Sequence, residues 1–177
     1  MKILIKDWNL NKGNNMKLHI VYKEMIPGVS IIPLINHVDE RGYLMELLNI
    51  NSTFFNKDKL PFAHSYITTS RPGIIKAWHM HEEQYDRIAV IKGTAKIALH
   101  DMRHNKSNLT NEFIVSPLNN MMILIPPYVA HGWMNVGNEE LIMINFSTKV
   151  YDNKKPDEIR YSFDNEEFEY DWNIKHR

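Results

Sequence analysis

The feature that most constrains the fold is a succession of short strand-like segments with almost no helical periodicity. Each segment is rich in β-branched, aromatic and aliphatic residues and is bounded by Gly, Pro, Asn or Asp, as is typical of strands separated by turns. Seven of them occur in under ninety residues, at 64–70, 74–80, 87–92, 94–100, 111–115, 121–126 and 141–147. Residues 30–34 and 42–49 predict further strands, and Gly93 predicts a hairpin or bulge. This pattern predicts an all-β sandwich or barrel.

The length of the chain predicts a single domain. A chain of 177 residues, of which 44% are hydrophobic, can close one sizeable core. We expect residues 1–25 to form an N-terminal extension with strands and residues 26–150 to form the barrel. Residues 151–177 are charged and aromatic, and we expect them to form a strap over the barrel.

Composition argues against several classes of partner and of chemistry. Lysine plus arginine (21) equals aspartate plus glutamate (21), so no overall field favours nucleic acid or an anionic membrane. There is no cysteine, which excludes disulfides, thiolate metal sites and a cysteine nucleophile and fits a reducing cytosol. No apolar run approaches the roughly 20 residues of a membrane-spanning helix, and residues 1–15 hold no continuous apolar segment of a signal peptide. We therefore expect a soluble, cytoplasmic protein.

Three histidines raise the question of a shared site. If KAWHMH (76–81) is a strand, its period of two places His79 and His81 on one face and Trp78 and Met80 on the other. A third histidine, His131, follows in PPYVAHGWMN (126–135). Histidines in strands are most often surface residues or satisfied core residues, so the pair alone does not establish a site.

The spacing around these histidines resembles the two motifs of the cupins. The first motif runs Gly73, five residues, His79, one residue, His81, four residues, Asp86, six residues, Gly93. Asp86 stands where the cupins usually have glutamate. The second runs Asn120, five residues, Pro126, one residue, Tyr128, two residues, His131, three residues, Asn135. The resemblance implies a cupin double-stranded β-helix, a jelly-roll barrel whose mouth holds the three histidines and Asp86.

Within the cupins, most of the chain resembles the dTDP-4-dehydrorhamnose 3,5-epimerase family and its sugar-nucleotide relatives. The segments that carry this resemblance are IPGVSIIPLINHVDERGYLMEL (26–47), SRPGIIKAWHMH (70–81), IALHDMRHNKSNLT (97–110) and LIPPYVAHGWMNVG (124–137). It implies a homodimeric epimerase or isomerase that acts on a nucleotide-diphospho-4-keto-6-deoxy sugar, in surface polysaccharide or deoxysugar biosynthesis. Such an enzyme removes a proton beside the ketone and returns one to the other face.

The same resemblance assigns roles to individual residues. It implies that His79 is the catalytic base and that Asp164 orients this imidazole and raises its basicity. The segment around Asp164 differs in length from its counterpart in the family, so Asp152, Asp157 or Asp171 could take its place. The residues expected to bind substrate are Arg41, Glu46, Lys76, His131 and Tyr151.

Three positions depart from the family pattern. The lysine that stabilises the enolate falls on Asp86, and the tyrosine that acts as the acid falls near Asn145. The glutamine two residues after the catalytic histidine is His81. Because a carboxylate repels a developing enolate, the charge at position 86 is the reverse of what the reaction needs.

Two of these departures restore the ligand set of a metal cupin. The residues that would hold a divalent transition metal (Fe, Mn, Ni or Zn) are His79, His81, Asp86 and His131. The alternative is a metal-free pocket in which Asp86 pairs with Arg87, Lys76 or a histidine. The epimerase interpretation by itself requires no cofactor.

Two other functions stay open. The sugar-nucleotide 3,4-ketoisomerases carry a His-x-His pair on this strand and use it to move protons between neighbouring carbons. His79 and His81 resemble that pair, which would make His81 catalytic as well. A non-catalytic, sugar-binding cupin would keep the barrel and its aromatic rim while losing the acid and the enolate stabiliser.

Overall fold

The computed structural model describes residues 6–10, 14–18, 20–21, 24–103 and 109–174, which form strands and loops. The strands are β1 (Lys6–Leu10), β2 (Asn14–Leu18), β3 (Ile20–Val21), β4 (Ser30–Pro33), β5 (Asn36–Asp39), β6 (Gly42–Met45), β7 (His64–Ser70), β8 (Ile75–His81), β9 (Asp86–Lys92), β10 (Ala95–Asp101), β11 (Thr110–Val115), β12 (Met121–Ile125), β13 (Val129–Asn135), β14 (Leu141–Ser147) and β15 (Glu158–Arg160). The one helical element in these ranges is the short 3₁₀ helix η1 (Glu166–Phe168). None of their helices is long and apolar enough to cross a membrane.

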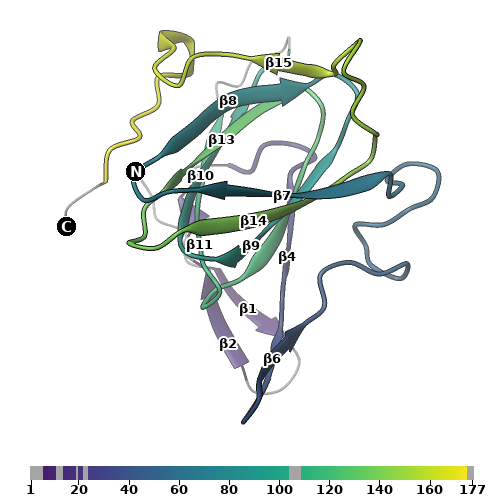
Figure 1. Ribbon diagram of the computed structural model, residues 1–177, viewed down its shortest axis with the longest axis vertical. Coiled ribbons are helices and arrows are strands. Elements are labelled where there is room, and N and C mark those ends of the chain that lie inside the picture. The colour runs from purple at the N-terminus through teal and green to yellow at the C-terminus, as the bar shows by residue number, and fades with distance from the viewer. Residues whose placement is uncertain (1–5, 11–13, 19, 22–23, 104–108, 175–177) are drawn as a thin grey trace.

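Two antiparallel sheets form the barrel (Figure 1). One has the strand order β15-β8-β13-β10-β11-β3 and the other has the order β4-β12-β9-β14-β7. Apolar side chains of both sheets, including Val90, Ile97 and Ile123, pack together as a buried core. The alternation of inward and outward residues in each strand provides these apolar faces. The predicted all-β cupin jelly roll is confirmed.

Most of the predicted strands form at the predicted places. The seven segments between residues 64 and 147 correspond to β7, β8, β9, β10, β11, β12 and β14. Strand β13, in contrast, was not among the predicted segments, because its sequence VAHGWMN contains glycine and two polar residues. Gly93 does lie between two strands, with a φ of 81° that favours glycine. A Cβ at this position would also lie 2.9 Å from the Cα of Leu141.

A second glycine allows β13 to approach β8 closely. A Cβ on Gly132 would lie 2.2 Å from the Cβ of Ala77 and 2.7 Å from its Cα, closer than real atoms come. The register of the β13–β8 pair also shifts between His131 and Trp133. This close approach brings His131 directly opposite His79. Gly132 therefore helps to assemble the histidine cluster.

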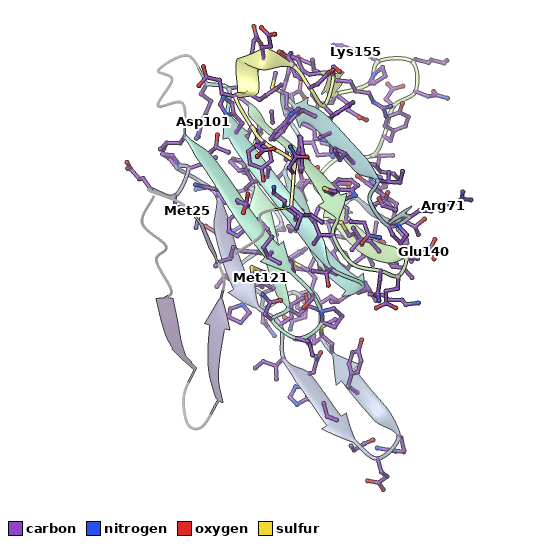
Figure 2. The ribbon with its side chains drawn as sticks, turned by 90° about the vertical axis from the view of Figure 1, so that its left-hand side faces the viewer. Met25, Arg71, Asp101, Met121, Glu140 and Lys155 are labelled. Atoms are coloured by element: carbon purple, nitrogen blue, oxygen red, sulfur yellow. The ribbon has the colours of Figure 1, made fainter. Side chains whose placement is uncertain are left out.

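Two segments extend the barrel. The hairpin β5–β6 projects from the end of the molecule opposite β15 and Lys155 (Figures 1 and 2). Near the C-terminus, β15 joins the six-stranded sheet beside β8. The residues after it carry Phe168, whose ring stacks on that of Trp78 with the centroids 4.6 Å apart. The segment expected to act as a strap thus contacts the strand that carries His79 and His81.

Candidate active site

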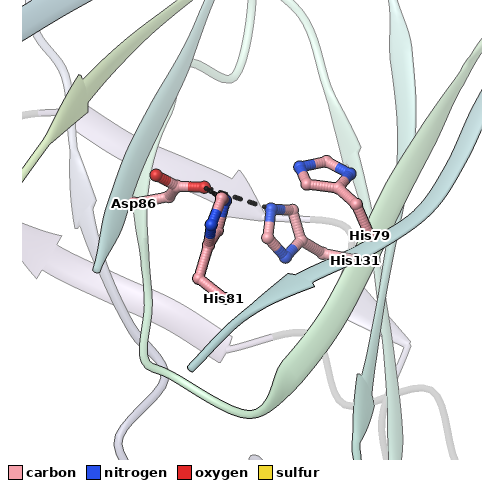
Figure 3. Close-up of side chains that lie close together, drawn as sticks. All are labelled: His79, His81, Asp86 and His131. Atoms are coloured by element: carbon pink, nitrogen blue, oxygen red, sulfur yellow. Dashed lines mark ion pairs between the residues drawn. The ribbon is translucent and has the colours of Figure 1, made fainter. Parts of the chain in front are cut away.

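Three strands bring the predicted histidines and Asp86 together (Figure 3). His79 and His81 come from β8, His131 from β13 and Asp86 from the start of β9. One ligand atom from each of the four lies within 4.8 Å of the others. Because His79 and His81 are two residues apart on one strand, they face the same space, as the period of two predicts. Trp78 and Met80 pack in a separate apolar cluster on the other face.

Asp86 is the centre of the cluster, and its two carboxylate oxygens have different surroundings. Oδ1 accepts hydrogen bonds from Nε2 of Gln84 at 2.7 Å and from Nδ2 of Asn145 at 2.8 Å. Oδ2 is buried with no hydrogen bond of good geometry, and it faces Nε2 of His81 at 3.3 Å and Nε2 of His131 at 3.2 Å. Burial acts to raise the pKa of Asp86, but the hydrogen bonds and charges of His131 and His81 outweigh it and hold the pKa well below its ordinary value. Asp86 is therefore a buried anion.

Hydrogen bonds from Nδ1 to backbone carbonyls fix the tautomers of His81 and His131. Nδ1 of His81 lies 2.8 Å from the carbonyl oxygen of Asp157, and Nδ1 of His131 lies 3.0 Å from that of Val129. A carbonyl oxygen only accepts, so each Nδ1 carries a hydrogen and each neutral ring presents the lone pair of Nε2 to Asp86. When both rings are neutral, two lone pairs and a carboxylate oxygen therefore converge with no hydrogen between them. A proton on either Nε2 supplies the hydrogen bond to Asp86 that lowers the pKa of this carboxyl. Such a site favours a cation, either a proton or a metal ion.

The pKa values of His81 and His79 are shifted in opposite directions. Burial acts to lower the pKa of His81. The hydrogen bond to Asp86, the charge of Asp86 and the hydrogen bond to the carbonyl of Asp157 outweigh it, so the pKa is raised. The pKa of His79 is lowered well below its ordinary value, first by burial and then by the neighbouring His131. His79 is accordingly neutral near pH 7, so one of its ring nitrogens has a lone pair that can accept a proton. In Figure 3 the ion-pair lines join Asp86 to His81 and His131 and not to His79. The His79 ring lies beside that of His131, with the centroids 4.0 Å apart.

The structure does not bring Asp164 to His79. Arg160 is the residue paired opposite His79 in the β8–β15 register. Asp164 is exposed, accepts a hydrogen bond from Ser162 and borders a separate surface hollow. Of the alternatives, Asp157 accepts a hydrogen bond from His81 with its backbone carbonyl, and its carboxylate accepts from the backbone of the turn after β8. The expectation of a carboxylate that raises the basicity of His79 is thus corrected: burial lowers its pKa instead.

A cavity of about 860 Å³ opens beside the cluster. His79 and His81 line it, and so do two of the residues expected to bind substrate, Lys76 and Tyr151. Lys76 donates a hydrogen bond to Thr68 at 3.2 Å. Its other charged side chains have both signs: the cations are Lys149, Lys155 and Arg160, and the acids are Glu82, Glu83, Asp152, Asp157 and Glu158. Two of these cations are already paired, Lys149 with Glu83 and Arg160 with Glu158. The cavity therefore offers charged groups of both signs and aromatic rings next to the histidines.

Two other predicted residues lie far from this cavity. Arg41 is at the tip of the β5–β6 hairpin, where it is exposed and paired with Asp39. Glu46 follows β6 and accepts a hydrogen bond from Asn49. Because the hairpin projects from the opposite end of the molecule (Figure 2), neither residue reaches the cavity of its own chain.

The structure adds a residue that the sequence interpretation missed. Tyr66 on β7 is paired directly opposite Asn145 on β14, and its hydroxyl accepts a hydrogen bond from Nδ2 of that asparagine at 2.9 Å. Tyr66 lines the cavity, and burial together with the charge of Asp86 raises the pKa of its hydroxyl to about 12. The alternation in HSYITTS placed Tyr66 and Thr68 on one face, but only the pairing of β7 with β14 shows which site that face borders.

This site belongs to a barrel with known relatives. Residues 37–159 match the family described as the polysaccharide biosynthesis C-terminal domain. The chain belongs to this family. It is 34% identical over 155 residues to the spore coat polysaccharide biosynthesis protein SpsL of Bacillus subtilis, covering 86% of this chain and 100% of that protein. It is 31% identical over 153 residues to the probable low-salt glycan biosynthesis epimerase Agl13 of Haloferax volcanii, covering 85% and 96%.

This member of the polysaccharide biosynthesis family also resembles proteins of known structure. The dTDP-4-dehydrorhamnose 3,5-epimerase of Sulfolobus tokodaii superposes with a TM-score of 0.69 at 26% identity, over 88% of this chain and 87% of that chain. The resemblance predicted from the sequence is thereby confirmed. These three relatives are a polysaccharide biosynthesis protein, a probable epimerase and an epimerase.

Proposed function

We propose that the protein is an epimerase or isomerase that acts on a nucleotide-linked 4-keto-6-deoxy sugar by removing a proton beside the ketone. The observation that carries this proposal is a pair of groups on the wall of one cavity. His79, which is neutral, comes from the six-stranded sheet, and Tyr66, which keeps its proton, comes from the five-stranded sheet. Inversion at carbon needs a base and an acid on different faces of the substrate, and two facing sheets can supply them.

In this mechanism His79 accepts the proton and Tyr66 returns one. Since the Tyr66 hydroxyl accepts a hydrogen bond from Asn145, its own hydrogen is free to point into the cavity. The asparagine at the position of the family's acid is thus compensated by a tyrosine on the next strand. This compensation removes one of the two arguments for a non-catalytic, sugar-binding cupin.

The walls of the cavity suit a nucleotide diphosphate. Lys76 and Lys155 supply positive charge for the phosphates, and Lys149 and Arg160 could add to it by exchanging their partners Glu83 and Glu158 for phosphate. Tyr151 is an exposed ring on which a base can pack. The names of SpsL, Agl13 and the Sulfolobus epimerase support a dTDP-linked or related sugar on the way to a surface polysaccharide or glycan. A cytoplasmic location stays a prediction from the sequence.

A homodimer would explain the position of Arg41 and Glu46. The β5–β6 hairpin carries Arg41 and is followed by Glu46. Its apolar side chains are largely exposed, with exposed fractions of 75% for Val38, 66% for Leu44 and 50% for Tyr43, which is unfavourable for a free monomer. Packing this hairpin against a second copy would cover these side chains. It would also allow Arg41 to approach the substrate of the partner.

We further propose that a divalent transition metal is held by His81, Asp86 and His131. The unsatisfied Oδ2 of Asp86 and the two lone pairs aimed at it fit a cation. Ligands bound to one ion at about 2.0–2.2 Å lie about 3.0–3.5 Å apart in common geometries, which matches the observed 3.2 and 3.3 Å. Such an ion would neutralise Asp86 and polarise the sugar ketone in place of the missing lysine.

This ligand set removes the conflict between the two roles of His79. A metal-bound imidazole cannot also act as a free base, but among the histidines that the structure describes it is His81 and His131 whose Nε2 atoms lie within 3.3 Å of Oδ2 of Asp86. Elemental analysis by inductively coupled plasma mass spectrometry tests the assignment. We expect near one transition metal per chain in the wild type and in His79→Ala, and its loss in His81→Ala. Metal lost equally in both variants would make His79 a ligand, and none in reconstituted wild type would reject the site.

Deuterium exchange tests the reaction itself. The protein, with and without added metal, is incubated in D₂O with dTDP-4-keto-6-deoxyglucose or its UDP counterpart, and the sugar is examined by NMR. Exchange with inversion at C3 or C5 supports an epimerase, while exchange at C3 with migration of the ketone supports a 3,4-ketoisomerase. We expect His79→Asn and Tyr66→Phe to slow exchange at least about 100-fold. Tyr85→Phe, which removes a hydroxyl outside the cavity lining, is the matched control. No exchange with either substrate would reject the proposed function.

A further inference from the structure

The turn between β8 and β9 is held by a carboxylate from a distant segment. The backbone N–H groups of Glu82, Glu83 and Gln84 all donate to the side chain of Asp157, at 3.1, 3.2 and 2.8 Å. Three consecutive amides that point at one place form a binding site for an anion. Here the chain supplies its own anion, from the residue directly before β15.

The same residue also holds one of the histidines of the site. The backbone carbonyl of Asp157 accepts the hydrogen bond from Nδ1 of His81 at 2.8 Å, between residues 76 apart in the chain. The side chain of Asp157 therefore anchors a peptide unit whose carbonyl selects the tautomer of His81. In that tautomer Nε2 is unprotonated and faces Asp86.

Asp157 is also linked to Asp86, through the hydrogen bonds of Gln84. The backbone of Gln84 is fixed by the carboxylate of Asp157, and its side chain donates to Oδ1 of Asp86 at 2.7 Å. One residue thus orients both partners of the His81–Asp86 pair without touching the reacting groups. Asp157 itself lines the cavity, in a wall segment that also includes Tyr151 and Lys155.

We propose that Asp157 is a positioning residue, which fixes the Nδ1-protonated tautomer of His81 and the orientation of Gln84 and so prepares the site for its ligand. This inference rests on the proposed function for its kinetic consequence, but the tautomer itself is a property of the free protein. A merely structural role, such as closing a turn, predicts lower stability with the same tautomer.

The test is a long-range ¹H–¹⁵N correlation spectrum of the histidine side chains in metal-free protein. Above the titration of His81, which the pH dependence of the same spectrum locates, the ring is neutral and the spectrum distinguishes a protonated Nδ1 from a protonated Nε2. We expect His81, assigned with His81→Gln, to show the Nδ1-protonated form in the wild type. Asp157→Ala should give a mixture of tautomers, and Asp157→Asn, which retains an acceptor oxygen, should restore much of the wild-type signal. If Asp157→Ala does not fold, Asp157→Ser takes its place.

The control is Asp152→Ala. Asp152 caps a turn in the same segment by accepting a hydrogen bond from the backbone of Lys154. Nδ1 of His81 donates to Asp157 instead. We expect this variant to keep the wild-type tautomer. An unchanged His81 signal in Asp157→Ala, or an equal change in Asp152→Ala, would overturn the proposal.

Kinetics separate this inference from the proposed function. With an active substrate, Asp157→Ala should lower kcat about 10- to 100-fold, as is usual for residues that orient a functional histidine, with little change in KM. A loss seen only in KM would reject the positioning role. If no nucleotide sugar is turned over but the tautomer shifts in Asp157→Ala, the proposed function fails while the role of Asp157 in orienting His81 stands.

Discussion

Arg87 is a buried cation that fastens the segment before β7 to the barrel. Its guanidinium donates to the backbone carbonyls of Phe146 at 2.7 Å, Phe54 at 2.7 Å, Leu60 at 3.2 Å and Pro61 at 2.6 Å. The residue is fully buried, and burial lowers its pKa from the ordinary value, with the charge of Asp86 opposing. Since Arg87 neighbours Asp86 on β9 but points the other way, its substitution tests the fold without removing a group of the site.

The cost of Arg87→Met follows from the carbonyl oxygens it leaves behind. A hydrogen bond to a charged donor contributes about 1.5–3 kcal/mol, so four of them set an upper limit of about 6–12 kcal/mol. The variant no longer has to desolvate a guanidinium, and the carbonyls of Leu60 and Pro61, which are half-buried, can reach water. We therefore expect a net loss of about 3–5 kcal/mol in the free energy of unfolding, typical of breaking a buried charged network.

Urea unfolding followed by tryptophan fluorescence measures this loss. Arg87→Lys is the matched control, because lysine keeps the charge but cannot place donors at all four carbonyls. We expect it to lose less, about 1–3 kcal/mol, and limited proteolysis of Arg87→Met to cut within residues 54–61. If Arg87→Met unfolds within about 1 kcal/mol of the wild type at an unchanged m-value, the carbonyls find other partners and the reasoning is refuted.

Other substitutions test packing and the C-terminal segment. Gly132→Ala places a Cβ 2.2 Å from that of Ala77, so we expect a loss of about 2–3 kcal/mol in urea unfolding, partly recovered by adding Ala77→Gly. Equal losses in the single and double variants would contradict this. Burial and the hydrogen bond to Glu112 raise the pKa of Tyr170, so its contribution is present below about pH 10, the value for an unfolded tyrosine, and is lost as the pH rises further. Unfolding experiments between about pH 8 and 11 should thus show a smaller alkaline loss in Tyr170→Phe than in the wild type.

The sequence predicted the fold class because its signal is local. Alternating apolar residues and turn residues define most strands without knowledge of their partners. Strand β13 was missed because its local composition is unlike that of the other strands, with Gly132 and His131 placed by the approach to β8 rather than by propensity. This strand depends on packing against segments far away in the sequence, and its own seven residues do not reveal that packing.

In the candidate site, too, the sequence predicted what depends on local pattern and missed what depends on strand pairing. The sequence determined that His79 and His81 share a face, that His131 and Asp86 belong with them, and that the family's acid tyrosine is missing at Asn145. It could not determine that Tyr66 stands beside that asparagine, since the two are 79 residues apart and meet only through the pairing of β7 with β14.

Tertiary structure also decided the charges and protons of the site. Burial, rather than a neighbouring carboxylate, sets the pKa of His79, and Asp164 lies elsewhere. The carbonyl that selects the tautomer of His81 comes from Asp157, 76 residues later in the chain. A sequence specifies which groups are present and which face of a strand they occupy. The field and the hydrogen bonds around each group depend on which strands become neighbours, and that is fixed only when the sheets close into the barrel.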